Sequence, residues 1–340
     1  ANQLLAVNAH MDLVEPKVAQ DSVSRIYLYY RDRIRGMVFG SRLTAELATD
    51  IPAFLVNDTT SGASGGPFDF AVYPDGRTVV TWENYSTVGS TIGLRIYDVS
   101  GGSVAGPLTV NSDGGGNAHW VPRVAVQPGS GLLVVWEDYR NGQPDILGRL
   151  YRGDGVPLGS EFGIVPPAAS AADQYTPHVI WSDSDKYVIG WIDRRAGQEV
   201  YVQRYNPVTG MVGNNTLASS GDTLFINWDM NLAVTPLGRT MAIWGTFGPD
   251  NSIMSRWFSF GVSPIGPPQT RNSSTVGRRW SPVAQFRSAG RFGLAWTEFA
   301  SEDADITFMA FDTAGNRLLG SEPLLNDDLI GAPATRDLVM

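Results

Sequence analysis

Short apolar segments separated by polar turns recur along the whole chain. In the clearest copy, the apolar segments 122–127, 132–136 and 145–151 alternate with the turn PGSG and the polar loop EDYRNGQP, and a fourth, 156–165, follows the turn RGDG. Short runs rich in β-branched and aromatic residues, bounded by Gly, Pro, Asn and Asp, are typical of β-strands. The pattern therefore predicts four short antiparallel strands in each unit.

The unit repeats with a period of about 53 residues, and each copy carries one aromatic anchor at the end of its second strand. The anchors are Tyr30, Trp82, Trp136, Trp191, Trp244 and Trp296. Four strands per unit with an aromatic marker are typical of a β-propeller blade. We therefore expect an all-β, six-bladed β-propeller with four antiparallel strands per blade. Seven blades is the alternative count, because the two chain ends share one phase of the repeat.

A proline marks the start of most repeats, 14 residues before the anchor in four copies and 15 before it in the second. We expect one propeller domain over 1–340, with units at about 16–66, 67–121, 122–176, 177–229, 230–281 and 282–332. The remaining segments, 1–15 and 333–340, are expected to be ring-closing or extra strands, because an unpaired sheet edge is a liability.

The second strand of each unit is apolar at consecutive positions, as in LLVVW, YVIGW and FGLAW. A strand buried on both faces loses the usual alternation of apolar and polar residues. The anchors are accordingly predicted to pack between blades. In the fifth unit, where Met230 replaces the proline, Trp228 and Trp257 are predicted either to fill gaps between blades or to stack on sugar rings.

The position 13 residues before the anchor is polar in five of six units, whereas the next position is apolar in all six. In a propeller this position opens the innermost strand, beside the central channel. Polar groups there need water or a ligand as partners. A hydrated channel mouth is one interpretation, and the other is a ligand-binding site made of Lys17, Asp69, Arg123, His178 and Asn231, with Val283 in the sixth unit.

Two residues after the anchor, most units carry a side chain that can accept hydrogen bonds. Asp and Asn often cap the backbone of a nearby turn, which is one interpretation. The other is a ring of acceptors on the loop rim for sugar hydroxyls or a metal, formed by Asp32, Asp138, Asp193 and Glu298.

Composition removes several classes of function. The net charge of −9 argues against nucleic acid, which needs a basic footprint. No apolar run approaches the roughly 18 residues of a membrane span, so no membrane insertion is expected. The chain has no cysteine, and its three histidines follow no zinc spacing, so we expect no metal site. We also expect no cofactor, and we assign no catalytic residues.

The motif P-x-V-A…G-x-x-V-V-W-x-D-x-R-x-G-x-x-D-I-x-x-R-x-Y…G-S-E-F is clearest in 122–162 and recurs in 177–205. It resembles the propeller-type repeats, about fifty residues long, of large secreted and surface proteins of bacteria. The resemblance implies an extracellular or cell-envelope location and a role in adhesion, display or scaffolding.

Two functions follow as expectations. The first is a secreted or cell-surface binding, adhesion or structural scaffold module, whose partner is a glycan, a protein or another copy of the chain. The alternative is a propeller glycoside hydrolase or lyase acting on a polysaccharide, with Asp138 and Asp193 as its carboxylates and Arg123 or His178 nearby. An enzyme should interrupt the repeat at its catalytic groups, and the regular acidic rim therefore favours the binding module.

Overall fold

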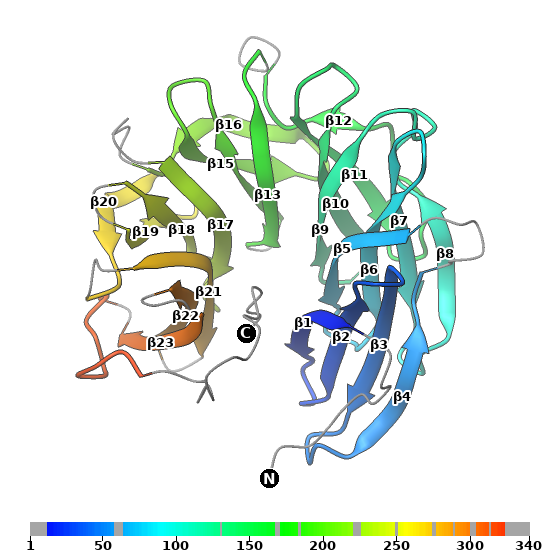
Figure 1. Ribbon diagram of the computed structural model, residues 1–340, viewed down its shortest axis with the longest axis horizontal. Coiled ribbons are helices and arrows are strands. Elements are labelled where there is room, and N and C mark those ends of the chain that lie inside the picture. Colours follow the sequence, from blue (N-terminus) through cyan, green and yellow to red (C-terminus); the bar gives the residue numbers. More distant parts are fainter. Residues whose placement is uncertain are drawn as a thin grey trace.

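The computed structural model describes residues 12–57, 64–129, 131–166, 171–182, 185–219, 226–248, 251–273, 277–287, 290–299, 304–312 and 314–323. Within these ranges the chain forms six antiparallel sheets arranged around a central axis, with no helix (Figure 1). None of the described segments is therefore a helix suited to crossing a membrane. The predicted all-β propeller with six blades is confirmed, and the seven-blade alternative is wrong.

Each blade is a meander whose first strand lies innermost (Figure 1). The first three blades are β1 (Leu13–Gln20), β2 (Ile26–Asp32), β3 (Met37–Leu43), β4 (Thr49–Leu55); β5 (Ser64–Val72), β6 (Thr78–Tyr85), β7 (Ser90–Tyr97), β8 (Ser103–Thr109); and β9 (His119–Gln127), β10 (Gly131–Asp138), β11 (Asp145–Arg152), β12 (Phe162–Gly163). The others are β13 (Gln174–Trp181), β14 (Tyr187–Asp193), β15 (Glu199–Asn206), β16 (Gly210–Leu217); β17 (Ile226–Val234), β18 (Thr240–Phe247), β19 (Ile253–Phe258), β20 (Pro264–Thr270); and β21 (Arg278–Arg287), β22 (Arg291–Phe299), β23 (Asp305–Asp312).

Two outer strands differ from the regular pattern. The predicted fourth strand at 156–165 is reduced to Phe162–Gly163 in β12. The sixth sheet has three described strands, and the Phe308 N–H on its outer strand donates to the Pro323 carbonyl at 3.1 Å. Residues 1–11 and 324–340 lie outside the described ranges, so the predicted pairing of the chain ends stays a prediction.

The inner strands begin three or four residues before the proline or Met230 that was expected to start each unit. At that point every inner strand contains a bulge, where its register to the second strand shifts. In five blades the residue just before the proline or Met230 has a positive φ of 44–54°. Proline fits at this interruption because it has no N–H to donate to the ladder.

The anchors are buried between blades, as predicted. Trp136 is fully buried among residues of blades 2 and 3, and Trp191 among residues of blades 3 and 4. Trp257 packs against Phe286 and Phe292, with ring centroids 5.3 and 5.8 Å away, and so fills the gap between the last two blades. The side chain of Trp228 lies outside the described part of the structure.

Candidate ligand-binding site in the axial cavity

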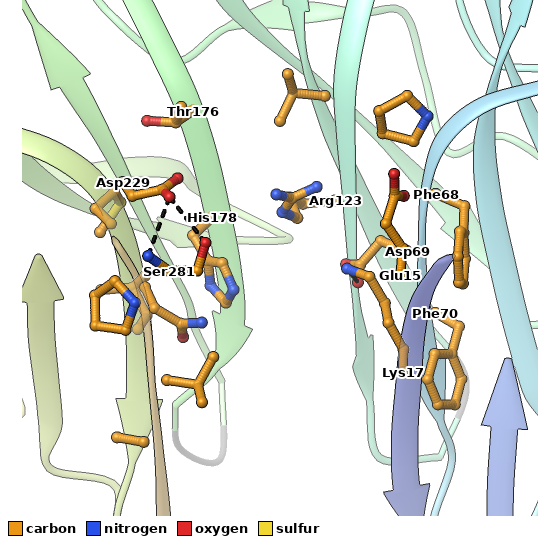
Figure 2. Close-up of a pocket in the computed structure, with 18 of the residues that line it drawn as sticks. Glu15, Lys17, Phe68, Asp69, Phe70, Arg123, Thr176, His178, Asp229 and Ser281 are labelled. Carbon is orange, nitrogen blue, oxygen red and sulfur yellow. Dashed lines mark hydrogen bonds and ion pairs between the residues drawn. The ribbon is translucent and has the colours of Figure 1, made fainter. Parts of the chain in front are cut away.

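The six inner strands enclose a cavity of about 540 Å³ on the propeller axis (Figure 2). Its volume falls in the range of small-molecule sites, which is roughly 300–1,000 Å³. The structure brings all six residues of the predicted position into its wall: Lys17, Asp69, Arg123, His178, Asn231 and Val283. Sequence reasoning thus located the cavity, whereas ligand binding by these residues stays a prediction.

An ion pair joins the first two blades in the cavity wall. Lys17 Nζ lies 3.1 Å from Asp69 Oδ1, and the Val124 N–H donates to Asp69 Oδ2 at 3.0 Å. Burial raises the pKa of the Asp69 carboxyl, but the charges of Lys17 and Arg123 outweigh it and hold that pKa below its ordinary value. The carboxylate is therefore ionised at neutral pH and fixed by strands of three blades.

Arg123 on β9 reaches into the space between the two walls of the cavity (Figure 2). Its Nη1 donates a hydrogen bond to the Pro122 carbonyl at 3.1 Å, and no described carboxylate forms an ion pair with it. A guanidinium offers five N–H donors in a planar fork that matches a carboxylate. Most of that donor capacity faces the cavity without a protein partner.

His178 on β13 stands on the opposite wall (Figure 2). Burial, together with the positive charge of Arg123, lowers the pKa of His178 to about 3. The imidazole is therefore neutral at physiological pH. Its Nδ1 is buried, and no described residue forms a hydrogen bond with it.

The cavity wall contains a second set of residues, which sequence reasoning missed. They lie on the inner strands two positions before the predicted set that includes Lys17 and Asn231. Glu15 forms an ion pair with Arg31, and Asp229 accepts hydrogen bonds from the Ser281 N–H and Oγ at 3.2 and 3.0 Å. These residues occupy the positive-φ position of the bulge. Their signal in the sequence is their place directly before the repeat proline or Met230.

The predicted rim residues lie beside this cavity without lining it. Asp32, Asp138 and Asp193 are fully buried, and the Arg140 and Arg195 N–H groups cap the last two at 3.1 and 2.9 Å. Glu298 forms an ion pair with Arg279 and accepts a hydrogen bond from Thr307 Oγ1 at 3.0 Å. All four carboxylates serve loop and blade contacts, which agrees with the capping interpretation; a ligand role for them stays a prediction.

The electrostatics of Asp138 fit this structural role. Burial raises the pKa of its carboxyl, but hydrogen bonds from His119, Arg140 and Trp136 outweigh burial and hold the pKa well below its ordinary value. The His119 pKa is in turn raised, because the hydrogen bond to Asp138 outweighs the effect of burial. The group is a buried ion-pair cluster between blades.

Aromatic pairs surround the start of the inner strands. The rings of Trp120 and Tyr139 lie 4.5 Å apart, those of Trp280 and Phe299 lie 4.6 Å apart, and Trp120 is 39% exposed. Four units carry an aromatic residue 16 positions before the anchor: Trp120, Tyr175, Trp228 and Trp280. This regularity is visible in the sequence, but it was not used to predict the site.

Among the described residues, no group of three or more His, Asp or Glu side chains is placed to hold a metal ion. The chemistry available in the cavity is that of three carboxyl groups, two cations, a neutral imidazole and two amides.

No family model matches this sequence, and no curated protein matches it. Solved structures with a similar fold include a lectin from Burkholderia pseudomallei, with a TM-score of 0.65, 12% identity and coverage of 91% of this chain and 83% of that one. A Penicillium chrysogenum α-L-arabinanase, solved with arabinobiose, has a TM-score of 0.59, 12% identity and coverage of 89% and 94%. An ulvan lyase has a TM-score of 0.58, 9% identity and coverage of 91% and 85%. At such identities the similarity shows a shared propeller fold, which in these neighbours is used for both binding and cleavage of glycans.

Proposed function

We propose that this chain is a glycan-binding β-propeller whose ligand enters the axial cavity. The observation that carries the proposal is the pair of polar groups that face one cavity: the partly buried Arg123 guanidinium, whose forked donors form no ion pair within the described residues, and the buried His178 Nδ1, which has no hydrogen-bond partner there. A buried polar atom without a partner is costly, and a ligand rich in hydroxyl and carboxyl oxygens would supply partners to both groups. The lectin among the structural neighbours supports this class of function.

Cleavage of a polysaccharide by β-elimination is the second candidate, because one observation favours it. Removing a proton next to a carboxylate needs an unprotonated base and a cation that stabilises the developing charge. His178 is unprotonated and Arg123 is a cation facing the same cavity. In that case Arg123 would hold the substrate carboxylate, His178 would accept the C5 proton, the C4–O bond would break to leave a double bond between C4 and C5, and the leaving oxygen would take a proton from water. A pKa of about 3 makes His178 a weak base, which is why cleavage ranks second.

We also propose that the protein works outside the cell or in the cell envelope. The support is the resemblance of its repeat to those of secreted and surface proteins of bacteria. A glycan is the partner that the cavity favours over a protein, since a concave site of about 540 Å³ suits one or a few sugar rings better than a flat protein surface.

The test is to fill the cavity. Asn231→Trp places a large ring in the cavity wall, and Asn214→Trp makes the same change at an exposed position on β16. After a glycan array identifies a ligand, calorimetry should show at least about tenfold weaker binding for Asn231→Trp and unchanged binding for Asn214→Trp, with both variants folded by circular dichroism. Equal binding by both variants would place the site elsewhere on the molecule.

The same samples separate binding from cleavage. Incubation of the ligand polysaccharide with the protein should leave its chain length unchanged if the protein only binds. Shortened chains that carry an unsaturated sugar, seen by their ultraviolet absorbance, would establish β-elimination instead.

A further inference from the structure

We propose that the axial cavity selects an acidic glycan, and that Arg123 binds the carboxylate of a uronic acid residue. This inference rests on the proposed glycan-binding function and adds the chemical class of the ligand. The observations behind it are the charge balance of the cavity wall, the state of His178 and the position of Trp120.

Most charged side chains in the wall have a protein partner, and Arg123 forms no ion pair within the described residues. Lys17 is matched by Asp69, and Glu15 by Arg31. Asp229 accepts two hydrogen bonds from Ser281. Of the two cations in the cavity wall, Lys17 has an ion-pair partner among the described residues and Arg123 has none. Arg123 is partly buried, and a carboxylate fits its forked donors with two parallel hydrogen bonds.

The nearby buried glutamates do not fill this role. Glu83 and Glu137 belong to the neighbouring second strands, and burial raises the pKa of both carboxyls, that of Glu83 to about 7. Their Oε1 atoms accept hydrogen bonds from the Val121 and Thr176 N–H groups at 2.5 and 2.7 Å. Both carboxyls thus accept hydrogen bonds from the bulges of the inner strands, and neither forms an ion pair with Arg123.

His178 indicates the sign of the charge that the cavity would accept. Burial comes first among the causes that lower its pKa, and Arg123 and Lys17 add to it. The imidazole is uncharged in the free protein, so the charge that an anion would meet is that of Arg123, which forms no ion pair within the described residues. A bound anion would offset that charge and raise the His178 pKa, whereas a neutral sugar would leave the charge in place.

Trp120 extends the site beyond one sugar. It lies on β9, three residues before Arg123, is 39% exposed and packs against Tyr139. Trp120 does not line the cavity itself, but an exposed aromatic ring on the strand that carries Arg123 can offer apolar contact to the C–H face of a sugar ring. The geometry thus favours an oligosaccharide whose acidic unit enters the cavity while the adjoining unit covers Trp120.

The experiment uses ligands that differ only in charge. Oligogalacturonate, oligomannuronate and oligoglucuronan are each compared with their carboxyl-reduced, neutral counterparts by calorimetry on the full chain. We expect at least one acidic oligosaccharide to bind about tenfold or more tightly than its reduced form, in line with the strength of a charged hydrogen bond. Arg123→Gln should remove this preference, Arg123→Lys should retain part of it, and Arg152→Gln, at an exposed arginine of β11, should leave it intact.

A second readout follows His178 itself. Nuclear magnetic resonance should show its pKa rising from about 3 when the acidic ligand binds, and staying constant with a neutral one. Equal affinity for acidic and reduced forms, with no effect of Arg123→Gln, would overturn the acidic ligand class and leave glycan binding standing. Binding of neither these ligands nor any neutral glycan on an array would overturn both proposals.

Discussion

The indole Nε1 of Trp136 donates a hydrogen bond of 2.9 Å to Oδ2 of Asp138, two residues further along the chain. The next blade repeats the pair at the same distance as Trp191 and Asp193. The anchor fills the core between blades, and the acid two residues later satisfies the one polar atom that the anchor buries. The repeated Trp-x-Asp element is therefore a structural unit, and the proposed ligand chemistry lies in the cavity.

The first prediction concerns the anchor. Trp136→Ala should lower the free energy of unfolding by about 3–5 kcal/mol, because it removes a fully buried ring and leaves a cavity. Trp120→Ala, at the exposed aromatic of the same blade, should cost only about 1 kcal/mol. Urea denaturation measures both. A Trp136→Ala variant as stable as the parent would contradict the packing assignment.

The second prediction separates the acceptor role of Asp193 from its charge. Asp193→Ala leaves Trp191 and Arg195 without their acceptor and should cost about 3–5 kcal/mol. Asp193→Asn keeps an acceptor and should be milder by about 1–2 kcal/mol. The second blade supports this, since Asn84 accepts from Trp82 Nε1 at 2.7 Å. Equal losses for the two variants in urea denaturation would rule out the acceptor role.

The third prediction is a pH dependence at Glu83. Burial raises the pKa of its carboxyl from 4.5 to about 7, so the folded chain holds a proton that the unfolded chain releases. The contribution of Glu83 to the free energy of unfolding is fully present below pH 4.5. It decreases by about 3 kcal/mol in total as the pH rises toward about 7. Glu83→Gln should remove that slope, whereas the exposed control Glu46→Gln should retain it. Unfolding free energies measured from pH 5 to pH 8 test this, and parallel curves for the parent and Glu83→Gln would refute it.

The fourth prediction is that Arg123 serves binding and not folding. No described carboxylate forms an ion pair with Arg123, but its charge helps to keep the pKa of Asp69 low, so Arg123→Gln should lower the free energy of unfolding by no more than about 1 kcal/mol. Asp69→Asn weakens the ion pair with Lys17 and should lower stability measurably. Thermal melting of the two variants side by side checks the contrast. A large loss of stability in Arg123→Gln would indicate a structural role instead.

The fold could be predicted because its determinants repeat. The period, the anchors and the apolar second strands depend on burial between blades, and burial leaves a pattern of residue types. The asparagines near the ends of fourth strands were equally visible, and Asn57 and Asn111 accept hydrogen bonds from the Val38 and Ile92 N–H groups at 2.8 and 2.9 Å, which continues the ladder.

The site could be predicted in part. The cavity wall at Lys17 and Arg123 follows from the register of the inner strand. The wall residues Glu15 and Asp229 were missed, because their positive φ leaves no mark in the residue type, and their signal was only their place directly before the repeat proline or Met230. The rim acids could be located from the sequence, but their roles could not be predicted. The sequence does not distinguish an Asp138 that faces solvent from one that accepts a hydrogen bond from Trp136.

The most direct measurement is a crystal structure of the protein with an acidic oligosaccharide chosen from the calorimetric comparison. The account predicts that the ligand occupies the axial cavity, with a carboxylate on the Arg123 guanidinium, His178 within hydrogen-bonding distance and a neighbouring sugar ring over Trp120. An oligosaccharide bound in a groove between blades, with only solvent in the axial cavity, would contradict it.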